Sequence, residues 1–161
     1  MPNWCQNQLT VMGATPELRA WLKDGGFSFQ RMKPVSPIKT KYAKPIKPWR
    51  KTDAQCSAWG TKWDLNDNEQ SEAASELLEC GNAWFDTAWS PPIEALTALS
   101  RRFPDDTFIL DYHEPSMGFA GHATFVGGEC DDQFTQEPSE VNHIAREIFG
   151  ADWDEDEDSA A

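Results

Sequence analysis

The sequence lacks long apolar runs, and none approaches the roughly 20 residues that a membrane-spanning helix needs. It opens with Met-Pro-Asn-Trp-Cys, without the basic and apolar regions of a secretory signal. Its 4 cysteines form no CxxC pair and no dense framework, which argues against a zinc ribbon and a disulfide scaffold. We therefore expect a cytoplasmic protein with reduced thiols and no membrane partner.

Local catalytic motifs are also missing. The sequence holds no nucleophile elbow, P-loop, dinucleotide-binding glycine motif, HExxH motif or zinc deaminase signature. Among its 3 histidines, His113 and His122 could face each other across a hairpin, but two ligands are too few for a typical zinc site. We accordingly expect no metal and no cofactor, and we favour a non-enzymatic protein over a small enzyme with a distributed active site.

Basic residues are scarce in the second part of the chain. The 161 residues include 27 acidic and 14 basic side chains, a formal net charge of −13. Residues 1–62 carry 11 basic and 3 acidic side chains, whereas residues 63–161 carry 3 and 24. A protein this acidic repels nucleic-acid phosphate unless its charge is unevenly spread. The separation of charge along the chain leaves room for both an acidic and a basic binding surface.

The first part of the chain predicts a βαβ unit. Residues 4–11 alternate between buried-type and polar side chains, which is typical of a strand. Pro16 suits the first turn of a helix, which we expect to end at Gly25. A short strand around Phe27 and Phe29 would complete the unit.

A second βαβ unit follows after residue 82. We expect strands at 84–89 and 107–113, a helix that begins near Pro91 between them, and a strand at 119–126 that pairs back as a hairpin. The apolar spacing at 141–148 predicts a final amphipathic helix. The residues expected to pack on one face of the sheet are Leu18, Trp21, Ile93, Leu96 and Leu99.

Together these units predict one α+β domain over residues 1–150. Its expected architecture is a ferredoxin-like sandwich, in which an antiparallel sheet carries helices on one face and the C-terminal helix is an addition. Residues 31–55 are expected to form a long inserted loop rich in lysine and proline, because four prolines disfavour a regular element there. Residues 151–161 are expected to be an acidic disordered tail, since like charges repel.

Four segments carry a distinctive pattern: MPNWCQNQLTVMG at 1–13, WGTKWD at 59–64, FDTAWSPP at 85–92 and YHEPSMGFAG at 112–121. In order and spacing they resemble the YubB-like ferredoxin-like domain family of bacteriophages and conjugative plasmids. The resemblance implies a ferredoxin-like fold and a setting in mobile elements, with roles such as countering host defences or supporting the establishment of incoming DNA. The family pattern also implies a hairpin at 69–82, although the composition there favours a helix.

The tryptophans of these segments have two interpretations. Core packing is the simpler one, because large aromatic rings are usually buried. In the other, the tryptophans and Lys62 form a pocket for a small ligand or a flipped base. Under core packing, the Lys62 side chain would extend its ammonium group to solvent or pair with Asp64 or Asp86. The family-motif residues singled out are Trp59, Gly60, Lys62, Trp63, Asp64 and Trp89, and Trp84 belongs to the same cluster of rings.

The inserted loop could bind nucleic acid. Its basic residues alternate with Tyr42 and Trp49, a combination that can follow phosphates and stack on bases. The alternative is that these charges balance the acidic part of the chain or remain solvated. The basic residues concerned are Lys39, Lys41, Lys44, Lys47, Arg50 and Lys51.

The preferred hypothesis is an interaction protein that inhibits a host defence system of the restriction or CRISPR type. Its acidic surface would mimic DNA phosphate and bind a nucleic-acid-binding host protein. The alternative is a nucleic-acid-binding accessory protein that acts through residues 31–51, and a small enzyme is the third hypothesis. The acidic residues expected to contact the partner are Asp105, Asp106, Asp131, Asp132, Asp152, Asp154, Glu155, Asp156, Glu157 and Asp158.

Overall fold

The computed structural model describes residues 3–35 and 55–150. In these residues a five-stranded sheet has the order β2-β1-β3-β4-β5, and all neighbouring strands are antiparallel. The strands are β1 (Trp4–Met12), β2 (Asn82–Ala88), β3 (Thr107–Glu114), β4 (Phe119–Val126) and β5 (Glu129–Thr135). The helices are α1 (Pro16–Gly25), α2 (Phe29–Met32), α4 (Asp67–Cys80), α5 (Ile93–Arg102) and α6 (Pro138–Phe149).

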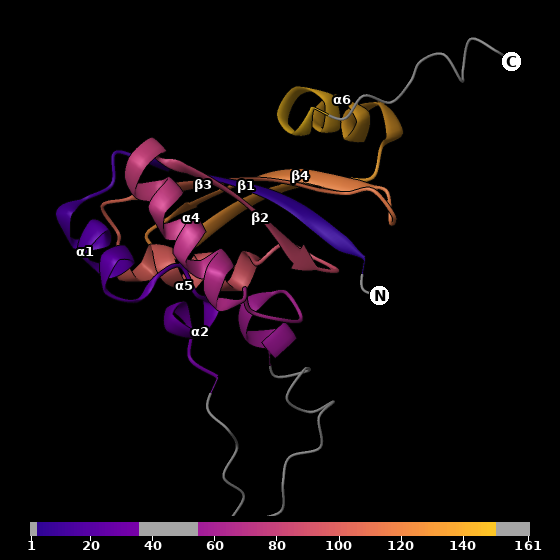
Figure 1. Cartoon of the computed structure of the whole chain (residues 1–161). Coiled ribbons are helices and arrows are strands. Elements are labelled where there is room, and N and C mark those ends of the chain that lie inside the picture. Colours follow the sequence, from indigo (N-terminus) through magenta and orange to yellow (C-terminus); the bar gives the residue numbers. More distant parts are fainter. Residues whose placement is uncertain (1–2, 36–54, 151–161) are drawn as a thin grey trace, which may run out of the picture.

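The helices occupy both faces of the sheet. Figure 1 shows α1, α2, α4 and α5 on one face and α6 alone on the other. The hydrophobic core lies between the sheet and the first four helices, and α6 packs on β3 and β4. The expected additional helix is present, but the expectation of helices on one face holds only for the other four. Of the five residues predicted to pack together, Leu18, Trp21, Leu96 and Leu99 are buried in this core and Ile93 packs against it.

Only the second predicted βαβ unit is present. Strands β2 and β3 flank β1 and are both antiparallel to it, so they are parallel to each other, and α5 connects them. The strand predicted around Phe27 and Phe29 is wrong, because the chain forms the short helix α2 there. Phe29 is fully buried against Phe27 and Trp59, and this packing does not depend on a strand.

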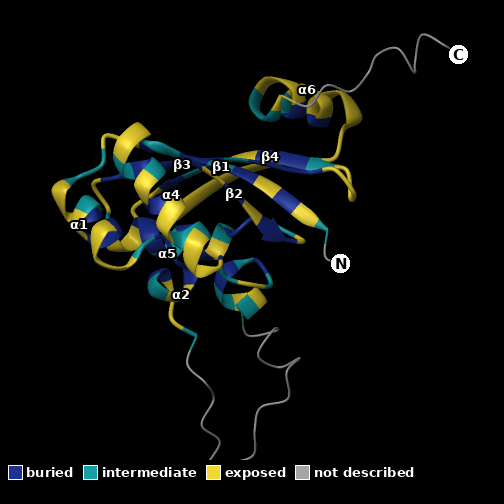
Figure 2. Cartoon of the chain, in the orientation of Figure 1, coloured by how far each residue is buried: buried dark blue, intermediate teal, exposed yellow. Residues whose placement is uncertain are grey.

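The predicted hairpin at 69–82 is also wrong, because this region contains the helix α4. The Asn66 side chain accepts a hydrogen bond of 2.9 Å from the Glu69 N–H and so caps the helix. Gly81 ends it with φ 78°, a left-handed conformation that glycine adopts easily. The helix buries Ala73, Ala74 and Leu77 and leaves Asp67, Glu72 and Glu79 exposed, so its composition was the better guide. Figure 2 shows buried and exposed positions interleaved along α4.

Strand β5 is not predicted by the sequence pattern. Six of its seven residues are exposed, so the period-two pattern that marks a half-buried strand is absent. The strand forms because Gly127 and Gly128, both with positive φ, return the chain alongside β4. Backbone pairing with β4 therefore defines this edge of the sheet. The side chains of β5 show little of the alternation from which a strand is predicted.

Two predicted segments fall mostly or wholly outside the described residues. Lys39, Lys41, Lys44, Lys47, Arg50 and Lys51 of the inserted loop lie in 36–54, and the acidic tail lies in 151–161. None of the helices that the structure describes combines the length and apolar character needed to cross a membrane.

Candidate functional site

Two of the four motif segments, 59–64 and 85–92, meet at the end of β2. The Thr61 hydroxyl donates a hydrogen bond of 2.8 Å to the Ala88 carbonyl, and the Ser90 hydroxyl donates to the Gly60 carbonyl. Gly60 has φ 83°, and a Cβ atom there would lie 3.0 Å from the Ile93 nitrogen. Glycine is needed at this position because both the backbone conformation and the close approach exclude a side chain. The two segments at 59–64 and 85–92 therefore form one structural unit.

Asp64 has a structural role in this unit. Its carboxylate accepts hydrogen bonds from the Ser28 hydroxyl at 2.7 Å and from the amide nitrogens of Phe29 at 2.9 Å and Gln30 at 3.1 Å. A carboxylate at the first amides of a helix satisfies donors that have no partner within the helix. This contact, between residues more than 30 positions apart in the sequence, explains why α2 is a helix.

Replacing Asp64 by alanine is expected to lower the free energy of unfolding by roughly 1–3 kcal/mol, because the three α2 donors and the Leu65 N–H all lose a charged acceptor. Urea denaturation followed by circular dichroism would measure the change. Asp105→Ala is the matched control, since Asp105 is exposed and should change stability by less than about 0.5 kcal/mol. Equal unfolding midpoints for wild type and Asp64→Ala would show that the cap contributes nothing.

The predicted burial of the tryptophans is correct for only one of the four. Trp59 is 2% exposed, and its indole N–H donates a hydrogen bond of 2.8 Å to the Lys33 carbonyl. In contrast, the exposed fractions are 41% for Trp63, 47% for Trp84 and 44% for Trp89. Trp84 alternates away from the core on β2, as does the equally exposed Trp4 on β1. Alternation on these strands placed both rings on the face that the first four helices leave uncovered.

Trp89 has an unusual backbone conformation. It is the only described residue other than glycine with a positive φ, at 73°. A bulky side chain in the left-handed region is strained. Hydrogen bonds from the Trp89 N–H to the Asn3 carbonyl at 2.8 Å and from the Thr87 hydroxyl to the Ser90 carbonyl at 2.7 Å hold the turn. The strained turn keeps the Trp89 ring at the surface beside the N-terminal end of β1.

Two adjoining cavities lie along the outer edge of β2. One, of about 280 Å³, is lined by Trp4, Trp84 and Phe85 together with three carboxylates. The other, of about 310 Å³, shares Trp4, Glu69 and Asp86 with the first and extends to Trp63. The Trp4 and Trp63 ring centroids are 6.3 Å apart, and the rings are tilted by 55°. We call this site the tryptophan pocket and define it by Trp4, Trp63, Trp84, Glu69, Glu72 and Asp86.

Partial loss of solvent affects two carboxylates of the tryptophan pocket, Asp86 and Glu69, whereas Glu72 is exposed. Partial burial raises the pKa of Asp86 above its ordinary value. The pKa of Glu69 is raised mainly by burial and also by the negative charges of Asp86 and Glu72. Within the described residues, none of these carboxylates takes part in an ion pair. Of the two alternatives for Lys62, pairing with Asp64 or Asp86 is not seen among the described residues, and its ammonium group lies 4.9 Å above the Trp63 ring. The negative charge of the pocket is therefore not balanced by a neighbouring side chain of residues 3–35 or 55–150, and the pocket suits a cationic ligand.

The Asp86→Asn variant is expected to be slightly more stable than wild type at pH 7. Because folding raises the pKa of Asp86, the charged form is disfavoured in the folded state, and removing the charge removes that cost. The gain should stay below about 0.5 kcal/mol, since exposed charges are screened. It should vanish when the pH falls below the ordinary value of 3.8, where Asp86 is protonated in both states. Thermal unfolding from pH 3 to pH 7 would measure it, and a destabilised Asp86→Asn protein would contradict this account.

Of the four described acidic residues that were predicted to contact a partner, three are exposed and one is buried. Asp106 is 1% exposed and accepts hydrogen bonds from the Thr15 N–H at 2.8 Å and hydroxyl at 2.7 Å, so its prediction as an accessible contact is wrong. Asp105 is exposed beside it. Asp131 and Asp132 are exposed on β5, where Asp132 accepts a hydrogen bond of 2.6 Å from the Tyr112 hydroxyl. The tail residues from Asp152 to Asp158 lie outside the described residues.

Arg31, the first basic residue of the predicted loop, belongs to the folded core region. Its guanidinium donates hydrogen bonds to the carbonyls of Trp21 at 2.8 Å and Gly26 at 2.6 Å and lies 4.1 Å above the Trp21 ring. Assigning Arg31 to an irregular nucleic-acid-binding loop is therefore wrong. The contact joins α1 to α2, which the sequence pattern does not show.

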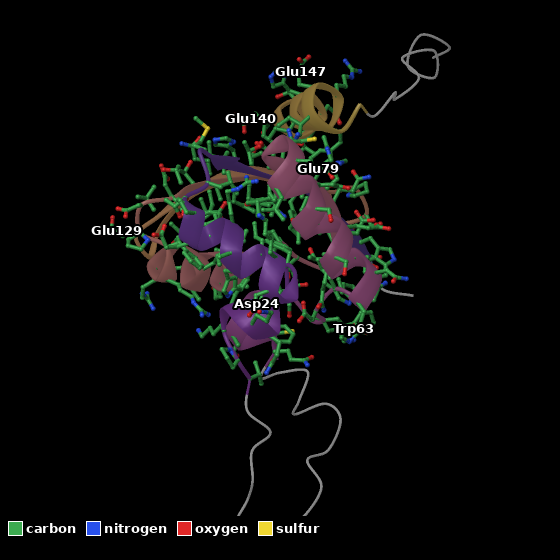
Figure 3. The ribbon with its side chains drawn as sticks, turned by 60° about the vertical axis from the view of Figure 1, so that its left-hand side comes forward. Asp24, Trp63, Glu79, Glu129, Glu140 and Glu147 are labelled. Carbon is green, nitrogen blue, oxygen red and sulfur yellow. The ribbon has the colours of Figure 1, made fainter. Side chains whose placement is uncertain are left out.

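The acidic surface of α4 is a candidate site that was not predicted from the sequence. Its 14 residues include five acidic and no basic side chains. Glu69, Glu72, Glu76 and Glu79 recur every three or four positions, which places them along one side of a helix. Figure 3 shows Trp63 near the start of α4 and Glu79 near its other end. In a hairpin these carboxylates would not share one side. Because a hairpin was predicted at 69–82, the acidic surface was not predicted.

The histidines form no metal site among the described residues. His113 is opposite Ala120 and His122 is opposite Asp111, so the two histidines do not face each other as expected. His122 Nδ1 is 2.6 Å from an Asp111 oxygen, and burial lowers the pKa of His113. In the part of the chain that the structure describes, no three His, Cys, Asp or Glu side chains come together as metal ligands.

The comparison with protein families gives one match. A family model described as the ferredoxin-like domain in Api92-like protein matches residues 58–158, more than half of the chain. This match and the antiparallel α+β sheet confirm the ferredoxin-like fold. No curated protein and no solved structure matches the chain.

Proposed function

The chain belongs to the family of the ferredoxin-like domain in Api92-like proteins, and we propose that it is a non-enzymatic interaction protein encoded by a phage or conjugative plasmid. In this proposal it acts in the host cytosol and occupies the nucleic-acid-binding surface of a defence protein of the restriction or CRISPR type. The resemblance of four sequence segments to YubB-like proteins supports the mobile-element setting. The acidic surface of α4 supports the binding function.

The single observation that carries the proposal is the uninterrupted row of carboxylates on α4 beside exposed tryptophans. The described residues include 20 of the 27 acidic side chains and 8 of the 14 basic ones, a formal charge of −12. Charge complementarity of this kind steers a basic partner toward its site and selects against other partners. Exposed tryptophan is frequent among the residues that contribute most to protein interfaces.

The spacing of the carboxylates is compatible with DNA mimicry. Glu69 and Glu79 are ten residues apart on α4, which is roughly 15 Å at the rise of an α-helix. Four carboxylates over that length give one charge about every 5 Å, against about 3.4 Å along a single DNA strand. A groove that binds phosphates would therefore find a similar, slightly sparser row of negative charge on this helix.

The experiment that tests the function is competition between the full-length chain and a 30-base-pair duplex for DNA-binding defence enzymes, a restriction endonuclease and a CRISPR effector. We expect the chain to inhibit DNA binding by its target without binding the duplex itself, and the inhibition to weaken as salt is added. A Glu72→Lys/Glu79→Lys protein should lose at least tenfold in inhibition. Glu137→Lys/Glu147→Lys is the control, because it makes the same change in charge at the start of α6 and within it.

Two results would contradict the proposal. The first is equal inhibition by both double variants, which would show that α4 is not the contact surface. The second is direct binding of the chain to the duplex, abolished by neutralising the basic loop, which would support a nucleic-acid-binding accessory protein instead. The residues to neutralise are Lys39, Lys41, Lys44 and Lys47.

A parallel set of variants measures the contribution of the acidic residues first predicted from sequence. Replacing Asp105, Asp131 and Asp132 by lysine reverses their charge and tests the folded surface away from α4. Reversal of the tail charges tests whether the C-terminal segment binds the same partner. The tail residues to reverse are Asp154, Glu155, Asp156, Glu157 and Asp158.

A further inference from the structure

We propose that the tryptophan pocket is a binding site for the guanidinium group of an arginine side chain on a partner protein. The inference deepens the proposed function and rests on it for the nature of the partner. It does not follow from that function, because a row of carboxylates on α4 could attract a basic surface without any pocket for one side chain.

Three separate parts of the chain build the pocket. Trp4 comes from β1, Trp63 from the loop before α4, and Trp84 from β2. Each ring keeps more than 40% of its surface exposed. Exposing large rings costs hydrophobic free energy, and exposed apolar clusters on a folded domain commonly mark interaction sites. The hydrogen bonds of Thr61 and Ser90 hold the loop that carries Trp63 against the end of β2.

The carboxylates of the pocket make it specific for a cation. The Glu69 carboxylate already accepts a hydrogen bond from the side-chain amide of Asn66, but Asp86 and Glu72 form no ion pair within the described residues. Asp86 lies in both cavities and shares them with the Trp4 ring. A carboxylate beside an aromatic face attracts a cation both by ion pairing and by the cation–π interaction.

The cation observed nearest to the pocket supports this chemistry. The Lys62 ammonium lies 4.9 Å above the Trp63 ring, so an indole at the pocket already has a positive group on one face. Cavities of about 280 and 310 Å³ can hold a single side chain but not a folded segment.

Arginine fits the pocket better than lysine. Its planar guanidinium can stack on an indole and donate two hydrogen bonds to one carboxylate, whereas an ammonium group is a compact point charge. Nucleic-acid-binding proteins use arginine to contact phosphates and to stack on bases. Here Asp86 would take the place of a phosphate, and the Trp4 and Trp63 rings would take the place of bases.

The test uses the full-length chain and a fluorescent heptapeptide of alternating glycine and arginine, with the lysine peptide of the same spacing for comparison. Fluorescence anisotropy would give both affinities, and ¹⁵N spectra would show which indole N–H signals move. We expect the arginine peptide to bind at least fivefold more tightly than the lysine peptide. The indole signals of Trp4, Trp63 and Trp84 should shift, while that of the buried Trp59 should not.

Two variants with a matched control locate the site. Asp86→Asn and Trp63→Ala should each weaken binding of the arginine peptide at least tenfold. The first removes the carboxylate that pairs with the guanidinium, and the second removes a ring on which it stacks. Asp86→Asn is expected to be fully folded, so its loss of binding cannot come from unfolding. Asp105→Asn removes the same charge from an exposed position away from the pocket and should leave affinity within twofold of wild type.

The outcomes separate this inference from the proposed function. Equal affinity for both peptides, or equal loss in Asp105→Asn and Asp86→Asn, would overturn the arginine site. If the α4 double variant loses inhibition of the defence enzyme while Asp86→Asn retains it, the proposed function stands and the pocket is not used. Selective arginine binding at the pocket without inhibition of any DNA-binding enzyme would keep the site and overturn the proposed function.

Discussion

Replacing Trp59 by alanine is expected to lower the free energy of unfolding by about 3–5 kcal/mol, the usual cost of deleting a large buried aromatic ring. Trp59 is 2% exposed, its ring centroid is 6.2 Å from that of Phe29, and its N–H is bonded to the Lys33 carbonyl. The variant would therefore lose apolar packing and leave a carbonyl without its donor. Equilibrium denaturation in guanidinium chloride would measure the change.

Trp63→Ala is the matched control, because it makes the same substitution four positions along the same motif. Trp63 is 41% exposed, so its removal should cost no more than about 1 kcal/mol. Trp59→Phe separates the two contributions, since it keeps most of the ring volume but loses the hydrogen bond. Similar destabilisation by Trp59→Ala and Trp63→Ala would show that burial does not distinguish the two tryptophans.

Leu96→Ala is expected to cost about 2–5 kcal/mol. Leu96 is fully buried on α5, in the layer between the sheet and α2, where the surrounding side chains cannot close a cavity completely. The lost stability includes the transfer of the missing methyl groups and the cavity that remains. Urea denaturation of purified protein would show an earlier midpoint with little change in slope.

The control for Leu96→Ala is Glu94→Ala, an exposed position on the same helix. It preserves helix propensity and should shift stability by less than about 0.5 kcal/mol. If Leu96→Ala unfolds at the midpoint of wild type, α5 does not pack on the sheet as described. If both variants unfold early by the same amount, the effect belongs to the helix and not to the core.

At the β2 edge, residues that stabilise the fold lie next to residues that we propose to bind a partner. Asp64 and Trp59 are held by hydrogen bonds inside the structure, whereas Trp63 and Asp86 lie in the same region without such partners. The first pair should be sensitive in unfolding experiments, and the second pair in binding experiments. This contrast within a few adjacent residues makes the motif region the most informative target for mutagenesis.

Several elements of the fold followed from the sequence alone. Period-two alternation predicted β1, β3 and β4, and apolar spacing predicted α1, α5 and α6. These patterns are local consequences of burying one side of an element, so they can be read without knowledge of its neighbours. The helical composition of α4 was equally local and correct, and the expectation of a hairpin from the family pattern overrode it.

Tertiary structure decided the remaining features. Helix α2 depends on the carboxylate of Asp64, and β5 depends on backbone pairing with β4, neither of which leaves a periodic pattern in the sequence. The tryptophan pocket also depends on tertiary structure. Its rings and carboxylates are visible in the sequence, but only the folded chain brings them together. Whether a tryptophan lies in the core, like Trp59, or at the surface, like Trp63, depends on which face of the sheet or loop it occupies once distant segments have packed together.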